Sequence, residues 1–223
     1  MENEKIRNLG LQLAGLSRQR RLKNRNYSII CNNCCGTLIN HLLLQEKRSP
    51  TENLTIELRE FPTFCRHLKA YLRLPMEEPT EEERGCYPET DRPLGILRGG
   101  PTLPDIHLVF WHYDSFPQAR DAWYRRRTRV NYENLFFLMD CSMDANEALL
   151  EEFRQIPSPN KMAFTHLPGK DTYRFFYYTE KRYKTAYMFV QEWRGPFLHR
   201  IMDRFPYIRW LNHGAKGDFL PPD

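Results

Sequence analysis

Residues 27–43 read YSIICNNCCGTLINHLL and join a short apolar segment directly to a helical pattern. Three further apolar segments follow, at 106–112 (IHLVFWH), 134–140 (NLFFLMD) and 161–165 (KMAFT). Helical patterns separate them at about 36–45, 116–128 and 144–154. Strands that alternate with helices in this way are typical of right-handed crossovers and a mainly parallel sheet.

The near-continuous apolar character of the four segments predicts strands that are buried on both faces. We therefore predict an α/β fold of three layers, α/β/α, with a mainly parallel or mixed central sheet that contains all four. Weaker patterns predict a strand at 54–58 and a helix at 61–72. In the last third of the chain, we predict strands at 173–178 and 187–193 and a helix at 197–205.

The composition is that of a globular protein, with 223 residues of which 41% are hydrophobic and 27% charged. The net charge of +5 lies in residues 1–25, which hold seven Lys or Arg against two Glu. Because the rest of the chain is neutral, we expect no nucleic-acid partner. We predict a basic N-terminal segment at 1–25 and a single domain at 26–223, interrupted at about 75–104 by a long loop rich in Pro, Gly and Glu.

Apolar residues recur at three- or four-residue steps near the N-terminus, namely Ile6, Leu9, Leu13 and Leu16. This spacing predicts a helix over about 3–22 whose other face is basic. Two interpretations stay open: the helix packs on its own domain, or residues 3–25 lie on an anionic membrane surface. Since we find neither a signal peptide nor a spanning segment, we expect a cytoplasmic protein, peripheral to the inner face of the membrane in the second case, with reduced cysteines.

Polar and reactive side chains follow all four predicted strands. Ligands of open parallel sheets bind outside the carboxyl ends of the strands, so we predict one site at that edge. The residues there are Asn32, Asn33 and Cys34 after the first strand, His112, Tyr113 and Asp114 after the second, Asp140 and Cys141 after the third, and His166 after the fourth. We assign Asn32, Tyr113 and Asp140 to substrate binding.

The CNNCCG turn at 31–36 suggests a nucleophile. Cys34 is predicted at the amino end of a helix, where free N–H groups and the helix dipole lower the pKa of a thiol. Asn33 would add a donor to an oxyanion pocket. The alternative is a structural turn in which Asn caps the helix and the cysteines pack on the sheet. Cys31 and Cys34 have redox spacing, whereas structural zinc needs a second Cys pair that the chain lacks, so we predict no metal site.

Two histidines and a basic helix complete the predicted site. His107 and His112 are five residues apart on one strand and so face opposite sides, and we predict His112 as the general base, with His107 directed away. Trp123, Arg126 and Arg127 on the next helix predict a clamp for the phosphate of a nucleotide sugar or of coenzyme A. The alternative is a solvated face with Trp123 packed on the sheet.

Three blocks of this sequence resemble a bacterial family of unknown function. They are YSIICNNCCGTLINHLL, DIHLVFWHYDSFPQARDAWYRRRTRVNYENLFFLMD and NKMAFT, within about residues 27–166. Members of that family are often labelled exopolysaccharide biosynthesis proteins, and some capsule-cluster relatives are regarded as acetyltransferases. The family pattern has Ser at the position of Cys31, which weakens a redox role for the Cys31–Cys34 pair. The resemblance implies a three-layer α/β/α domain and a role near surface glycans.

These observations together lead us to expect an enzyme of exopolysaccharide or capsule assembly. Its reaction would be acyl transfer to a sugar or polysaccharide precursor, with acetyl-coenzyme A as co-substrate and no tightly bound cofactor. Cys34 would be the nucleophile or part of the oxyanion pocket, His112 the base, and Arg126 and Arg127 the anion contacts. Direct transfer from acyl-coenzyme A, without a covalent Cys34 intermediate, is equally allowed.

Two other functions stay open. The first is a glycosyl or other sugar-modifying transferase that uses a nucleotide sugar, with Asp140 or Asp114 holding a divalent metal. The second is a glycan-binding or scaffold protein without catalytic activity.

Overall fold

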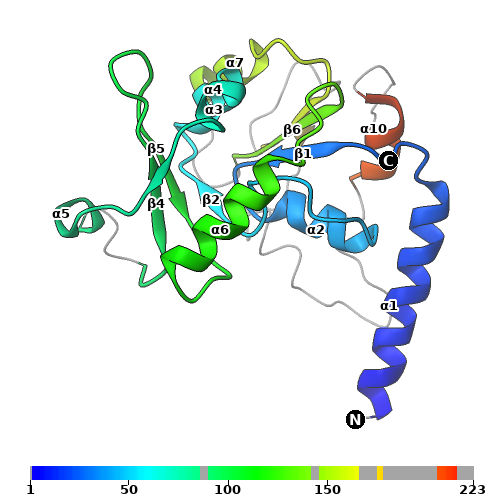
Figure 1. Ribbon diagram of the computed structural model, residues 1–223. Helices are drawn as coiled ribbons and strands as arrows, with labels where there is room; N and C mark the ends of the chain where they lie inside the picture. Colours follow the sequence, from blue (N-terminus) through cyan, green and yellow to red (C-terminus); the bar gives the residue numbers. More distant parts are fainter. Residues whose placement is uncertain (1, 86–89, 142–145, 166–174, 178–204, 215–223) are drawn as a thin grey trace.

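The computed structural model describes residues 2–85, 90–141, 146–165, 175–177 and 205–214 (Figure 1). The strands form two sheets. The first is parallel, in the order β1 (Ser28–Cys31), β6 (Leu135–Asp140), β7 (Lys161–Thr165) and β8 (Phe175–Tyr177). The second is antiparallel, in the order β2 (Thr55–Ile56), β5 (Ile106–Val109), β4 (Leu94–Leu97) and β3 (Met76–Glu77). The α/β class is therefore confirmed.

Helices cover both faces of the parallel sheet. The described helices are α1 (Glu2–Arg21), α2 (Cys35–Leu42), α3 (Phe61–Arg66), α4 (Leu68–Tyr71), α5 (Glu81–Arg84), α6 (Phe116–Arg127), α7 (Glu147–Arg154) and α10 (Tyr207–His213). Helices α2 and α10 pack on one face. Helices α3, α4 and α7, together with the antiparallel sheet, pack on the other.

Successive residues of the parallel strands point into different layers. Ile29 and Phe136 pack with α2 and α10, whereas Ile30 and Phe137 pack with α3, α4 and α7. None of these four side chains is more than 4% exposed. Burial on both faces explains the near-continuous apolar segments. The predicted three-layer arrangement thus holds around the parallel sheet.

The prediction that segment 106–112 belongs to this central sheet was wrong. The segment forms β5, which pairs with β2 and β4 in the antiparallel sheet. In β5 the buried residues Ile106 and Leu108 alternate with the half-buried His107 and Val109, a pattern typical of a sheet with one solvated face. Because Val109 is apolar, this alternation is hard to recognise in the sequence.

The segment at 75–104 is more structured than predicted. It contains β3, α5 and β4, of which β4 is fully buried. This strand, LGIL, follows Pro93 and contains Gly95. Both residue types are rare inside strands, so the sequence did not indicate one here. Residues 86–89 of this segment lie outside the described residues, as do the predicted strand at 187–193 and most of the predicted helix at 197–205.

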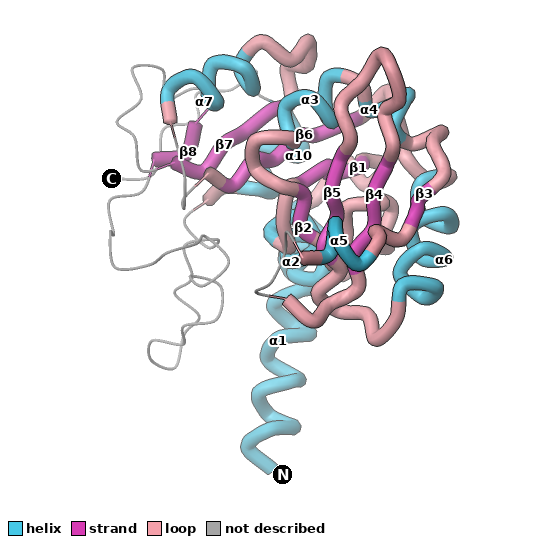
Figure 2. Tube along the Cα trace, turned by 90° about the vertical axis from the view of Figure 1, so that its left-hand side faces the viewer, coloured by secondary structure: helices cyan, strands magenta, loops and turns pink. Residues whose placement is uncertain are grey.

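The N-terminal helix α1 is confirmed over nearly the predicted range. It extends away from the two sheets, with its carboxyl end beside α10 (Figures 1 and 2). There Asn212 Oδ1 accepts hydrogen bonds from the backbone N–H groups of Lys23 (2.7 Å) and Asn24 (3.2 Å). Among the described residues, no helix has the length and apolar character that crossing a membrane requires.

Candidate functional site

The turn after β1 is held against the end of β6 by Asn32. The side chain of Asn32 accepts a hydrogen bond from Asp140 N (2.7 Å) and donates one to Asp140 O (3.0 Å), which continues the pairing of the two strands. The carbonyl oxygen of Asn32 accepts a hydrogen bond from Ile56 N (2.8 Å). Asn32 therefore joins both sheets at the carboxyl end of β1, and at 4% exposure it is a structural residue here.

Asn33 is engaged at both ends of its side-chain amide. Its Oδ1 accepts a hydrogen bond from Cys35 N (3.0 Å), and its Nδ2 donates one to Asp140 Oδ2 (2.7 Å). This is the turn interpretation, in which Asn satisfies a free N–H group at the start of α2. The carboxylate of Asp140, which is only 6% exposed, accepts the hydrogen bond that fixes the Asn33 side chain in this turn. The next residue, Cys141, is buried and donates from Sγ to Phe164 O (2.9 Å).

The prediction that the pKa of the Cys34 thiol is lowered was wrong in direction. Cys34 stands at the N-cap of α2 and is 7% exposed. Burial, followed by the negative charge of Glu52, raises its pKa to about 11, although the Lys47 ammonium acts in the opposite sense. Loss of water around the thiolate thus outweighs the helix dipole. Cys31 and Cys35 are also buried, and burial raises the pKa of both thiols. All three cysteines of this turn are free thiols in this structure, so no disulfide joins Cys31 to Cys34.

Glu52 is a member of this site that the sequence analysis missed. Its side chain is 2% exposed, and its Oε1 accepts a hydrogen bond from Asn40 Nδ2 (2.7 Å). Its Oε2 has no hydrogen-bond partner among the described residues. Burial raises the pKa of this carboxyl, against the effects of the Asn40 hydrogen bond and of the Arg126 and Lys47 charges. Glu52 lies in a segment without periodicity between α2 and β2, so no sequence signal marks it.

The predicted anion clamp on α6 was wrong, because its two arginines hold the protein's own backbone. Arg126 is 8% exposed, and its Nη1 donates to Glu52 O (3.0 Å) and to the hydroxyl of Tyr113 (2.6 Å). Arg127 Nη1 donates to the carbonyl oxygens of Leu72 (3.0 Å) and Leu74 (3.1 Å). These carbonyls lie just after α4, so Arg127 completes that helix end.

Trp123 was also wrongly assigned to substrate binding. It is 1% exposed and packs in the core, with its ring centroid 6.4 Å from that of Phe64. Trp123 thus takes the packed position of the alternative interpretation. Among the described tryptophans, Trp111 is the exposed one, at 43%, and its Nε1 donates to Thr55 Oγ1 (2.7 Å).

His112 lies on the surface directly after Trp111, in the loop that follows β5. Its pKa is lowered by partial burial and then by the positive charges of Lys47 and Arg92. The Lys47 charge also lowers the pKa of Cys34 and of Glu52, so one ammonium influences three titratable groups. In the same loop, Tyr113 reaches the Glu52 segment through Arg126, whereas Asp114 is exposed. His166 lies outside the described residues.

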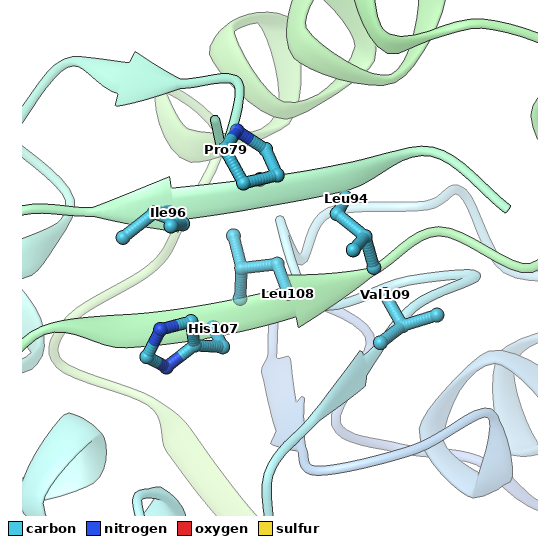
Figure 3. A pocket seen from close by; sticks show the side chains of 7 residues that line it. Pro79, Leu94, Ile96, His107, Leu108 and Val109 are labelled. Atoms are coloured by element: carbon cyan, nitrogen blue, oxygen red, sulfur yellow. The ribbon is translucent and has the colours of Figure 1, made fainter. Parts of the chain in front are cut away.

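His107 has a different partner. Its Nδ1 lies 2.6 Å from Glu60 Oε1, and its backbone N–H donates to Glu60 Oε2 (2.7 Å). This carboxylate raises the pKa of His107. The ring lies on the antiparallel sheet near Ile96 and Leu108, beside a cavity of about 10 Å³ (Figure 3). That space is too small for anything larger than a water molecule.

The chemistry available at this edge is acid–base chemistry. A surface imidazole with a lowered pKa is neutral at pH 7 and accepts a proton. Lys47 forms no ion pair with a carboxylate in the described part of the chain, so its charge is available to an anionic ligand. Within the described ranges, no three His, Cys, Asp or Glu side chains are arranged to hold a metal ion.

The model of the family described as "Domain of unknown function (DUF1919)" matches residues 6–212. The chain belongs to this family. An uncharacterised protein of Haemophilus influenzae is 30% identical over 199 residues, which cover 87% of this chain and 88% of the relative. The DUF1919 match begins within α1 and ends within α10, so both sheets and the site around Cys34, Glu52 and His112 lie inside the family domain.

Proposed function

We propose that this DUF1919 protein is an acyltransferase of exopolysaccharide or capsule biosynthesis that moves an acetyl group from acetyl-coenzyme A directly to a sugar hydroxyl. The observation that carries the proposal is His112, a surface imidazole whose pKa is lowered by partial burial and then by the positive charges of Lys47 and Arg92. A neutral base among cations suits a reaction between a hydroxyl group and an anionic donor. The resemblance to exopolysaccharide biosynthesis proteins supplies the class of acceptor.

In the proposed reaction, His112 removes the proton of the acceptor hydroxyl as its oxygen attacks the thioester carbonyl. The new C–O bond forms, the C–S bond breaks, and the thiolate of coenzyme A takes the proton from the imidazolium. Lys47 and Arg92 attract the phosphates of the donor. Positioned acid–base catalysis of this kind contributes about 10²–10⁴-fold to the rate.

Trp111 supports a sugar as the acceptor. Its ring is 43% exposed next to His112, and the hydrogen bond from Nε1 to Thr55 Oγ1 (2.7 Å) holds it in place. An exposed, oriented indole offers an apolar face to the C–H groups of a pyranose while its N–H stays satisfied. Trp111 would thus place the acceptor beside the base.

The state of Cys34 supports direct transfer over a covalent route. A thiol with a pKa of about 11 holds very little thiolate at pH 7, and the thiolate is the nucleophile. At 7% exposure it is also poorly accessible to an acyl donor. In this proposal Cys34 and Glu52 do not take part in the chemical step.

The experiment is a transfer assay with radiolabelled acetyl-coenzyme A and a panel of hexoses, N-acetylhexosamines and nucleotide sugars. We expect acetylation of a sugar, and His112→Gln should lower kcat by at least about 100-fold. His67→Gln is the matched control, because His67 is exposed and remote from the carboxyl edge of the parallel sheet. Full activity in His112→Gln would overturn the assignment, and an acetyl adduct on Cys34 in mass spectra would replace direct transfer by the covalent route.

A further inference from the structure

A basic surface lies at the opposite edge of the parallel sheet from the candidate site. A groove of about 560 Å³ runs between the carboxyl end of α1 and α10. Its polar and charged lining comes from both helices, namely Arg18, Arg21, Arg209, Asn212 and His213. Residues 12–27 and 205–214 together contain six Lys or Arg and no Asp or Glu. The charge of this surface is therefore of one sign.

Three exposed cations of this surface are not neutralised by the described part of the chain. Arg20, Arg21 and Lys23 are exposed, and none of them forms an ion pair with a described carboxylate. Arg25 donates only to the carbonyl oxygens of Gln19 (3.2 Å) and Leu22 (3.4 Å). Three exposed cations close together favour an anionic partner.

Exposed leucines lie beside these cations. Leu13 is 58% and Leu16 46% exposed on α1, and helical spacing places both on one stripe with Arg20. Leu44, 43% exposed, lies against the same helix, because a Cβ added at Gly15 would come within 3.0 Å of its Cγ. Apolar side chains next to cations distinguish a lipid surface from a nucleic acid, which offers nothing for three leucines to bury into.

The surface is preorganised rather than a loose tail. Leu22 is 1% exposed and packs with α2 and α10. Asn212 caps the junction: its Nδ2 donates to Arg21 O (3.0 Å) while its Oδ1 accepts from Lys23 N and Asn24 N. Helix α1 thus projects from the domain in one direction with its basic end anchored (Figures 1 and 2).

We propose that this α1–α10 surface, comprising Leu13, Leu16, Leu44, Arg20, Arg21 and the groove, docks on the anionic phospholipid headgroups of a membrane. The leucines enter the headgroup region, and Arg20, Arg21 and Lys23 contact lipid phosphates. The proposal is independent of the transferase reaction. It gives a reason for an enzyme of glycan assembly to work at a membrane without a spanning helix.

The test is co-sedimentation of the full chain with vesicles. We expect binding to vesicles that contain phosphatidylglycerol, none to pure phosphatidylcholine, and loss of binding as salt rises from 50 to about 500 mM. Arg20→Glu with Arg21→Glu should lower the partition coefficient at least about tenfold. The control is Arg120→Glu with Arg125→Glu on α6, which changes the net charge equally. Leu13→Ser with Leu16→Ser should weaken binding several-fold without removing its salt dependence.

Three results would overturn the proposal. The first is no sedimentation of the wild-type protein with either vesicle. The second is an equal loss in the α6 control, which would make the effect one of net charge alone. The third is a thermal shift with soluble glycerol phosphate that matches the effect of vesicles, since the groove would then bind a free phosphate compound rather than a lipid surface.

Discussion

Asn33 donates a 2.7 Å hydrogen bond from Nδ2 to the Oδ2 of Asp140, across 107 positions of sequence. The same side chain accepts from Cys35 N at 3.0 Å. One amide therefore starts α2 and ties it to the end of β6. A hydrogen bond to a carboxylate in a poorly exposed setting is among the stronger ones in proteins, so this contact stabilises the carboxyl edge of the parallel sheet.

Asn33→Ala should lower the free energy of unfolding by about 2–3 kcal/mol, because it removes the hydrogen bond to Cys35 N at the start of α2 and the charge-assisted hydrogen bond to Asp140. Asn146→Ala is the control: Asn146 caps α7, which like α2 has eight residues, by accepting from Leu149 N (2.8 Å). Losing that cap alone should cost about 1 kcal/mol. Urea denaturation of both variants measures the difference. If Asn33→Ala costs no more than Asn146→Ala, the bond to Asp140 contributes nothing.

Asn33→Asp should be worse than Asn33→Ala at pH 7, because it places a second carboxylate beside that of Asp140. Repulsion raises the folded-state pKa of one of the pair above its unfolded value of about 3.9. Such a group stabilises the fold below its unfolded pKa, and this contribution is lost as pH rises through the folded pKa. The variant should therefore regain stability relative to wild type as pH falls from 7 toward 4. If the difference in free energy of unfolding between Asn33→Asp and wild type stays constant across that range, the two carboxylates do not repel each other.

Burial and neighbouring charge set the reactivity of Cys34 in this structure. Glu52→Gln keeps an acceptor for Asn40 but removes the negative charge that raises the pKa of Cys34, so alkylation of Cys34 by iodoacetamide should accelerate roughly three- to tenfold. Lys47→Met removes the charge that lowers this pKa and should slow the reaction. Peptide mass spectrometry measures both rates, with the fully buried Cys35 as the internal reference. Changes of the same sign in the two variants would rule out an electrostatic cause.

Replacing Trp111 and Trp123 by Ala should lower the stability of the fold by very different amounts. Trp123→Ala should cost about 3–5 kcal/mol of stability, because a 1% exposed core side chain is lost. Trp111→Ala should cost about 1 kcal/mol or less, because the ring is 43% exposed and makes one hydrogen bond. On the proposed function, Trp111→Ala should also raise the KM for the sugar acceptor several-fold with little change in kcat. An unchanged KM would exclude Trp111 from acceptor binding.

Local patterns predicted much of this fold. A strand that is buried on both faces has a continuous run of apolar residues, so segments such as 135–140 can be recognised from the sequence. The pairing of strands depends on contacts that no local pattern contains. β5 joined the antiparallel sheet because β2 and β4 flank it, and β4 is concealed by Pro93 and Gly95.

The candidate site shows the same limit. The predicted strand ends place Asn32, Asn33 and Asp140 at one edge of the sheet, because the carboxyl ends of neighbouring parallel strands meet. In the structure, both asparagines hydrogen-bond to Asp140. The sequence could not show that these polar groups hydrogen-bond to one another, nor that the charge of a buried carboxylate from an irregular segment acts on Cys34. The pKa of the Cys34 thiol was predicted from a helix terminus alone, whereas burial and then the charge of Glu52 raise it.

The last prediction concerns the pH dependence of His112. A general base acts when neutral, and the pKa of His112 is lowered from 6.5 by burial and by Lys47 and Arg92. The acid limb of kcat/KM should therefore lie below pH 6.5, with activity rising as pH increases through it. Because the folded state disfavours the charged ring, protonation also favours unfolding, so this group's contribution to stability is lost as pH falls below its unfolded pKa.

Lys47→Met should move this limb to higher pH, by up to about one unit, because it removes a positive charge that disfavours the imidazolium. Higher salt should move it the same way by screening both cations. Lys69→Met is the matched control, since Lys69 lies over the ring of Tyr132 at the other edge of the molecule and changes the net charge equally. Titration of the His112 ring protons by NMR measures the pKa without reference to turnover. A value at or above 6.5, or an equal shift in Lys69→Met, would remove the local electrostatic basis for His112 as the base.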